Sequence, residues 1–143
     1  MKLFKSLKAI AIVCLPALII TSCSKDNDDE GGGGTPELAG YWKGNTTPPG
    51  NFTNPLNGLN LSMKAGNKVR VYYSTVQRPL NDTSASDVIK EDGTYSVNGD
   101  FVDIVTARIN CQGTKNAAFT NMQGTFIYSD FGITLTQNFI VKK

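Results

Sequence analysis

Apolar and polar residues alternate along most of the chain after Leu38, which is the pattern of half-buried β-strands. The pattern is clearest from Leu59 to Ser74, where two alternating segments flank a turn at Gly66-Asn67 and predict a β-hairpin. No segment in this part of the chain combines a helical period with capping residues. We therefore predict an all-β fold.

Seven segments of this region are predicted as strands, and turn-forming residues separate them: 38–44, 59–64, 69–74, 95–97, 101–109, 117–128 and 131–141. Two connections are long, Asn45–Asn57 and Thr75–Lys90, and the second leaves room for an eighth strand or a helical turn near Asp87–Lys90. Successive hairpins predict an antiparallel up-and-down meander. Closure into a small barrel of about eight strands would remove its exposed edges.

The predicted register decides which side chains face the core. Asn98-Gly99 predicts a type I′ turn, and Ser129-Asp130 is predicted to turn the chain between the last two strands. Segment 101–109 is apolar on both faces, which suits a strand covered on both sides or one with a bulge. The inward rows of the last two strands are predicted as Ala118, Met122, Phe126 and Tyr128, and as Phe131, Ile133, Leu135, Phe139 and Val141, interrupted by Gln137.

Residues 1–22 have the three parts of a secretory signal peptide: lysines at the front, an apolar run from Ala9 to Ile20, and then small residues. The run of 12 residues is shorter than the roughly 20 apolar residues that a membrane-spanning helix needs. Ile20-Thr21-Ser22-Cys23 resembles the bacterial lipobox, whose cysteine receives a diacylglyceryl group. The resemblance implies a lipoprotein lipidated at Cys23. The alternative is an ordinary signal peptide that leaves a soluble secreted protein.

Residues 23–36 are predicted as a flexible tether, because Ser24–Glu30 is acidic without any apolar residue and four glycines follow it. Lys25-Asp26 and Asp28-Asp29-Glu30 resemble the signal that sends lipoproteins of Bacteroidetes to the outer face of the outer membrane. The acidic run is thus either an export signal or only a solvated spacer. Residues 37–143 form the predicted folded domain.

The charges and the cysteines restrict the function further. The chain carries 14 Lys and Arg against 12 Asp and Glu, which does not suggest a nucleic-acid partner. There is no histidine, and Cys111 is the one cysteine left after Cys14 leaves with the signal and Cys23 is lipidated. Cys111 lies in a turn-like stretch and has no histidine to activate it, so we expect an incidental thiol rather than a reactive one. We expect no enzyme, no cofactor and no metal site.

Gly40-Tyr41-Trp42 in the first predicted strand resembles the G-x-W motif of lipocalins, fatty-acid-binding proteins and avidins, the barrels grouped as calycins. Glu91–Gly99 and Met122–Phe126 resemble strand patterns of small lipocalin-like lipoproteins of Bacteroidetes. The resemblance covers about Leu38 to Val141. It implies a lipocalin-like β-barrel in which Gly40 lets the chain bend close to the barrel base and Trp42 plugs the closed end.

On this basis we expect an outer-membrane lipoprotein, facing the cell surface, whose barrel binds a small apolar or sugar-like ligand at its mouth. The candidate ligand-binding residues are Trp42, Tyr72, Tyr73, Tyr95 and Arg108. One alternative is a barrel filled by its own core, in which these residues have structural roles. The other is a protein-interaction module, such as a hydrolase inhibitor or a subunit of a surface complex, with Phe52 and Arg78 of the long loops as anchors.

Overall fold

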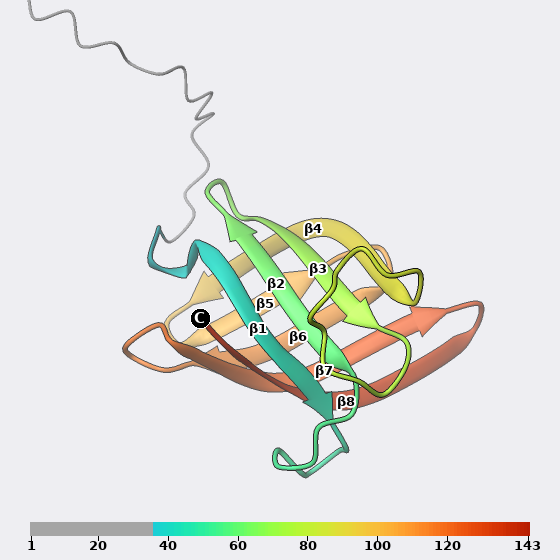
Figure 1. Cartoon of the computed structure of the whole chain (residues 1–143). Helices are drawn as coiled ribbons and strands as arrows, with labels where there is room; N and C mark the ends of the chain where they lie inside the picture. Colours follow the sequence, from blue (N-terminus) through green and yellow to red (C-terminus); the bar gives the residue numbers. More distant parts are fainter. Residues whose placement is uncertain (1–35) are drawn as a thin grey trace, which may run out of the picture.

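The computed structural model describes residues 36–143, so the predicted signal peptide, Cys23 and the tether up to residue 35 lie outside the described residues. Figure 1 shows strands that follow one another round a closed barrel. The elements are the 3₁₀-helix η1 (Pro36–Leu38) and the strands β1 (Gly40–Thr47), β2 (Gly58–Lys64), β3 (Lys68–Ser74), β4 (Val88–Asn98), β5 (Phe101–Val105), β6 (Ile109–Lys115), β7 (Asn121–Asp130) and β8 (Ile133–Lys142). Each strand pairs antiparallel with the next, and β8 pairs with β1. The predicted all-β meander and its closure with eight strands are confirmed.

The hairpin predicted at Leu59–Ser74 is confirmed as β2 and β3. Lys64 pairs with Lys68, and the turn between them has positive φ at Gly66 (71°) and Asn67 (59°), residue types that adopt this conformation at little cost. The predicted inward side chains are at most 3% exposed: Leu59, Leu61, Met63, Val69, Val71 and Tyr73. Alternation therefore predicted both the strands and the core that they contribute.

The prediction of segment 101–109 as one strand is wrong: β5 ends at Val105, and the eighth strand, β6, begins at Ile109 and continues through residues 110–115, where no strand was predicted. Thr106, Ala107 and Arg108 reverse the chain between β5 and β6, and the Thr106 hydroxyl accepts a hydrogen bond from the amide of Ile109 at 2.9 Å. This turn changes which residues face inward, so Ile104 before it and Ile109 after it are both buried. The segment is apolar on both faces because two phases of alternation meet there and because β5 also exposes Phe101 (68%) and Val105 (43%) on its outer face. Cys111 consequently lies in a strand, not in a turn.

The two long connections are shorter than predicted because strand pairing extends into them. Thr46 and Thr47 continue β1 by pairing with Phe139 and Asn138 of β8. On the other side, β4 begins at Val88 and runs through Asp92-Gly93 without a break, since residues 88–94 pair with β3. A strand near Asp87–Lys90 therefore exists, but it is the first part of β4 and not a separate eighth strand.

The turn predicted at Asn98-Gly99 lies one residue further along the chain. Asn98 pairs with Phe101, so Gly99 and Asp100 form the turn, and only Gly99 has positive φ (61°). That is the pattern of a type II′ turn rather than the predicted type I′.

The β7–β8 hairpin is longer than the barrel, and its register explains the remaining errors. Its turn lies at Phe131-Gly132, with φ of 45° and 80°, and not at Ser129-Asp130. The predicted inward residues Phe131, Ile133 and Leu135 are 97%, 73% and 37% exposed, because the hairpin projects beyond the other strands (Figure 1). Inside the barrel the predicted phase is confirmed, since Gln137, Phe139 and Val141 are buried. Ala118, also predicted inward, is exposed because it precedes β7.

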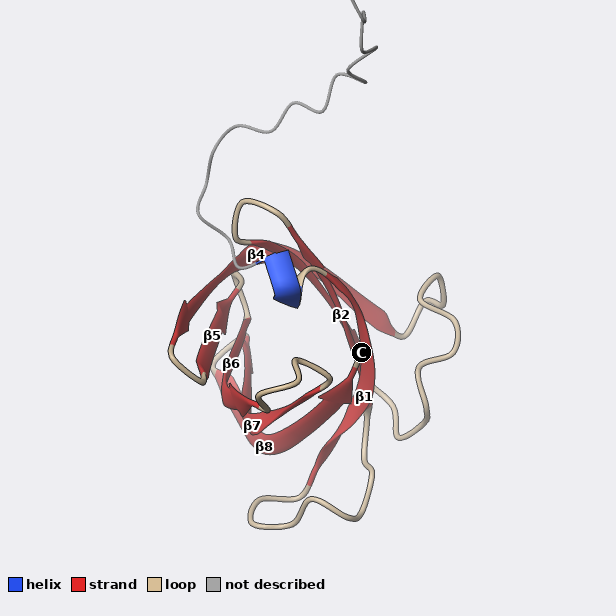
Figure 2. Ribbon diagram, turned by 90° about the vertical axis from the view of Figure 1, so that its left-hand side faces the viewer, coloured by secondary structure: helices blue, strands red, loops and turns tan. Residues whose placement is uncertain are grey.

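The interior of the barrel is packed with the protein's own side chains. The largest fully buried ones are Trp42, Phe126, Phe139, Leu38, Leu59, Leu61, Ile104, Ile109, Met122, Val71, Val102 and Val141. Figure 2 looks at one end of the barrel, and η1 lies across it. Leu38 of η1 is fully buried, so this helix closes the end with an apolar side chain.

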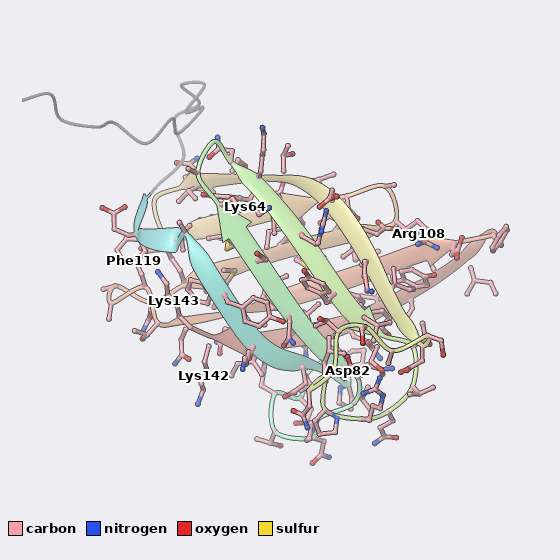
Figure 3. All side chains as sticks on the ribbon, turned by 45° about the horizontal axis from the view of Figure 1, so that its top comes forward. Lys64, Asp82, Arg108, Phe119, Lys142 and Lys143 are labelled. Carbon is pink, nitrogen blue, oxygen red and sulfur yellow. The ribbon has the colours of Figure 1, made fainter. Side chains whose placement is uncertain are left out.

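The barrel has two different ends. The closed end carries η1, the β2–β3 and β4–β5 turns, and the β6–β7 loop with Phe119. The open end carries both long connections, the turn at Arg108 and the tip of the β7–β8 hairpin. Figure 3 shows Phe119 and Arg108 at these opposite ends. No helix within residues 36–143 is long and apolar enough to cross a membrane.

Candidate functional site

Two of the predicted ligand-binding residues, Trp42 and Tyr95, are buried at the closed end. Trp42 is fully buried, and its indole Nε1 donates a hydrogen bond to the Leu38 carbonyl at 3.0 Å. Gly40 has φ of 137°, which a residue with a side chain rarely adopts, so the glycine allows the chain to turn from η1 into β1. Tyr95 is 3% exposed, and its hydroxyl donates to the Lys64 carbonyl at 3.1 Å. Both side chains fill and close the barrel.

Tyr73 and Tyr72 point to opposite sides of the barrel wall. Tyr73 faces the interior, with its ring centroid 4.7 Å from that of Phe126 and 5.7 Å from that of Tyr128. Burial raises the pKa of Tyr73 to about 12. Tyr72 faces outward and packs on Tyr41 at 6.3 Å between centroids. The two neighbouring tyrosines therefore cannot share a ligand.

Arg108 is held in an ion-pair cluster at the open end. Its guanidinium donates to Glu91 and, at 3.1 Å, to Asp130, while its backbone amide donates to Glu91 at 2.9 Å. Burial would raise the pKa of the Glu91 carboxyl, but hydrogen bonds from Thr106 and Arg108 outweigh it, so the pKa is lowered. The cluster ties β4, the β5–β6 turn and the end of β7 next to the Phe131-Gly132 turn together. The charged side chains of this cluster are already hydrogen-bonded to one another.

The predicted interface anchor Arg78 is also tied down. Its guanidinium donates twice to Asp87, at 2.7 and 2.9 Å, and Asp87 accepts a third bond from the Ser74 hydroxyl at 3.0 Å. The hydrogen bond from Arg78 lowers the pKa of Asp87 to about 2. The pair closes the connection between β3 and β4. The five predicted ligand-binding residues and Arg78 are thus divided among the core, the outer wall and the open end of the barrel, and they do not form one site.

The residues that do converge line a groove on the outer wall of the barrel, across β4, β5, β6 and β7. Its volume is about 650 Å³, and its aromatic residues are Phe52 and Phe101. Its polar side chains are Ser96, Asn98, Asp103, Gln112, Thr114 and Gln123. Of the candidate ligand-binding and interface residues named from the sequence, Phe52 alone belongs to this groove.

Strand register arranges the polar side chains in two rows. Ser96, Asp103 and Gln112 lie directly opposite one another on β4, β5 and β6. The next row toward the closed end contains Asn98, Phe101, Thr114 and Gln123. All face outward because side chains alternate along each strand and the intervening residues, such as Val102 and Met122, are buried.

Phe52 reaches the groove from the loop that follows β1. The Asn138 side chain on β8 donates to the carbonyls of Pro48 and Asn51, at 3.0 and 3.4 Å, and holds this loop against the outer wall. The Asn51 side chain in turn accepts from the amide of Thr53 at 2.7 Å, which fixes the turn around Phe52. Phe52 is 40% exposed and Phe101 68%, so the groove has two accessible aromatic walls.

The chemistry of the groove is hydrogen bonding between two aromatic walls. Amide and hydroxyl side chains both donate and accept, and Asp103 adds one carboxylate. Asp103 Oδ1 is buried and has no hydrogen-bond partner among the described residues. Burying such an oxygen without a donor costs free energy. A hydrogen bond to Asp103 from a neighbouring hydroxyl or amide, or from a ligand hydroxyl, would therefore be favourable.

The described residues offer little else for chemistry. Cys111 is fully buried, and burial raises the pKa of its thiol, so it remains an unreactive thiol. Within residues 36–143, no three His, Cys, Asp or Glu side chains are placed to hold a metal ion together. No similar protein assigns a role to the groove, because comparisons of the chain with protein-family models, with curated proteins and with solved structures gave no match.

Proposed function

We propose that this chain is an outer-membrane lipoprotein facing the cell surface, and that its barrel domain binds a small, neutral, sugar-like ligand in the outer groove. The observation that carries the proposal is the pairing of two exposed aromatic rings, Phe52 and Phe101, with a floor of amide and hydroxyl side chains. A sugar ring has apolar C–H faces and a rim of hydroxyl groups. The aromatic walls suit the faces, and the polar rows suit the rim.

The groove supports this proposal better than the mouth of the barrel does. Its volume of about 650 Å³ lies within the roughly 300–1,000 Å³ of small-molecule sites. The barrel interior is filled by fully buried side chains, including Trp42, Phe126 and Phe139. A purely apolar ligand would leave the polar rows unpaired and lose their bonds to water. A protein partner held by the long loops is less well supported, because Arg78 is occupied by Asp87.

The lipid anchor is supported by the residue pattern around Cys23, which lies outside the described residues. The described chain enters the barrel at the closed end, where η1 lies. An anchor that precedes η1 would be attached next to this end. The groove on the side wall and the loops of the open end would then stay accessible to ligands.

The anchor is tested by replacing Cys23 with serine in producing cells. We expect the parent chain to stay with the membrane fraction after a carbonate wash and the Cys23→Ser chain to be released, because a lipobox serine cannot receive the lipid. Release of the variant with an unchanged unfolding midpoint would separate anchoring from folding. Equal membrane recovery of the two chains would exclude lipidation at Cys23.

Ligand binding in the groove is tested with Phe101→Ala and a panel of neutral mono- and disaccharides, measured by isothermal titration calorimetry. We expect Phe101→Ala to weaken binding about tenfold, which corresponds to about 1.4 kcal/mol. Val105→Ala is the matched control, because Val105 lies on the same outward face of β5, is 43% exposed and does not line the groove. Saccharide binding that survives Phe101→Ala unchanged, or no binding by the parent chain, would refute the proposed site.

A further inference from the structure

The β8 strand has a free edge at the open end of the barrel. Its pairing with β1 ends at Asn138, whereas its pairing with β7 continues to Ile133. Within residues 36–143, segment Ile133–Gln137 therefore has a neighbouring strand on one side only. This segment belongs to the part of the β7–β8 hairpin that projects from the barrel (Figure 1).

The direction of the backbone groups along β8 follows from its regular pairing. The register with β7 is continuous from Lys142 back to Ile133, and the amide of Lys143 donates toward β7, to the Thr120 carbonyl at 3.0 Å. Because backbone groups alternate along a strand, the N–H and C=O groups of Leu135 point toward β7 as well. Those of Thr134 and Thr136 point away from β7, to the free edge. The amide of Ser129 agrees with this phase, since it bonds across to Arg108 on the opposite side of β7.

The free edge lacks the devices that usually protect edge strands. Natural edges carry lysine, proline or a bulge that prevents another strand from pairing with them. Segment Phe131–Gln137 has no charged residue and no proline, and its pairing with β7 shows no bulge. It also exposes Phe131 (97%), Ile133 (73%) and Leu135 (37%). Phe131 has a positive φ that bulky residues rarely adopt, so the backbone is locally strained where this aromatic ring lies at the tip.

We propose that two copies of this chain associate through this edge as an antiparallel β-sheet with a two-fold axis at Leu135. In that register Thr134 of each copy lies opposite Thr136 of the other, and both residues direct their N–H and C=O groups into the interface. Each of these two pairs exchanges two hydrogen bonds. Leu135 lies opposite Leu135 of the second copy at the closely spaced position between them, where side chains meet best. The same patch thus serves on both copies, as a two-fold interface requires.

The charges around the edge favour a second copy over a charged partner. The nearest carboxylate, Asp130, is bound to Arg108 at 3.1 Å and to the Tyr128 hydroxyl at 2.8 Å. Two copies therefore meet without facing like charges, and no local charge is left to select an acidic or basic peptide. Phe131 of each copy then lies next to the point where β1 of the other leaves the sheet, and this contact covers the exposed ring.

Disulfide crosslinking tests the register. In the full-length chain, Leu135→Cys places two thiols opposite each other at a Cα separation of about 4.5 Å, which a disulfide can bridge. Ile133→Cys is the matched control, because Ile133 is more exposed but lies about 13 Å from its equivalent in the second copy. Under a mild oxidant we expect a covalent dimer for Leu135→Cys. For Ile133→Cys we expect no more crosslinking than the parent chain shows through its own cysteines. Equal crosslinking of both variants, or none above background for Leu135→Cys, would overturn the proposal.

Sedimentation equilibrium of the purified full chain in detergent tests the association itself. We expect a concentration-dependent dimer for the parent chain and a monomer for Thr134→Pro, since proline removes an amide that points to the free edge and leaves the β7 hydrogen bonds in place. Circular dichroism of Thr134→Pro should match that of the parent, which separates loss of the dimer from loss of the fold. A monomeric parent chain, or a Thr134→Pro chain that is folded and still dimeric, would show that the edge is not a contact between copies.

Discussion

Replacing Trp42 with alanine is expected to lower the free energy of unfolding by about 3–5 kcal/mol, the usual range for removing a large buried aromatic side chain. Trp42 is fully buried beneath η1, and its indole Nε1 donates to the Leu38 carbonyl at 3.0 Å. Alanine would leave a cavity at the closed end and a buried carbonyl without its donor. The loss is a large share of the roughly 5–15 kcal/mol that stabilises a typical domain. Urea denaturation of the parent and the variant measures it.

Tyr72→Ala is the control for Trp42→Ala. Tyr72 lies on the outer face of β3 and contacts the Tyr41 ring, so its removal should change the free energy of unfolding by less than about 1 kcal/mol. The single tryptophan also reports directly on its surroundings: its emission should be blue-shifted and poorly quenched by acrylamide. Solvent-like emission together with an unchanged unfolding midpoint for Trp42→Ala would exclude a closed barrel end packed on this residue.

Local sequence patterns predicted most of the strands, and they predicted one hairpin correctly in both its register and its turn. The β2–β3 hairpin could be predicted from the alternation of its residues and from Gly66-Asn67 alone. Segment 101–109 could not be predicted from local patterns alone, because the turn at Thr106–Arg108 depends on a hydrogen bond to the side chain of Glu91, far away in the sequence. Without that contact, residues on both sides of the turn merge into one apolar run. The missing eighth strand is a consequence of this single error.

The candidate groove could not be predicted from the sequence for the same reason. Its polar rows depend on the register of β5, β6 and β7, which follows only once the turn at Thr106–Arg108 is in place. Its second aromatic wall depends on Asn138, which binds the loop of Phe52 across most of the chain. The aromatic ligand-binding candidates chosen from the sequence lie on strands, and three of them, Trp42, Tyr73 and Tyr95, are in the core, whereas Tyr72 faces outward.

Gly44→Ala is expected to lower the free energy of unfolding by about 3 kcal/mol, at the upper end of the range for overpacking. Gly44 lies at the seam that closes the barrel, where β1 pairs with β8. A Cβ atom at this position would lie 1.9 Å from the Ile140 carbonyl oxygen and 2.7 Å from Val141 Cα, which are both backbone atoms. No side-chain rotation can relieve these contacts, so β1 and β8 would have to move apart.

Hydrogen exchange distinguishes opening of this seam from a general loss of stability. In Gly44→Ala we expect faster exchange of the β1 and β8 amides that pair across the seam, such as those of Asn45 and Ile140, at denaturant concentrations where the β3–β4 amides remain protected. Lys43→Ala changes the exposed neighbour of Gly44 and should leave both the seam and the unfolding midpoint unchanged. An alanine at position 44 with parent-like stability and exchange would mean that β1 and β8 do not approach each other this closely, and the closure of the barrel would have to be explained by other contacts.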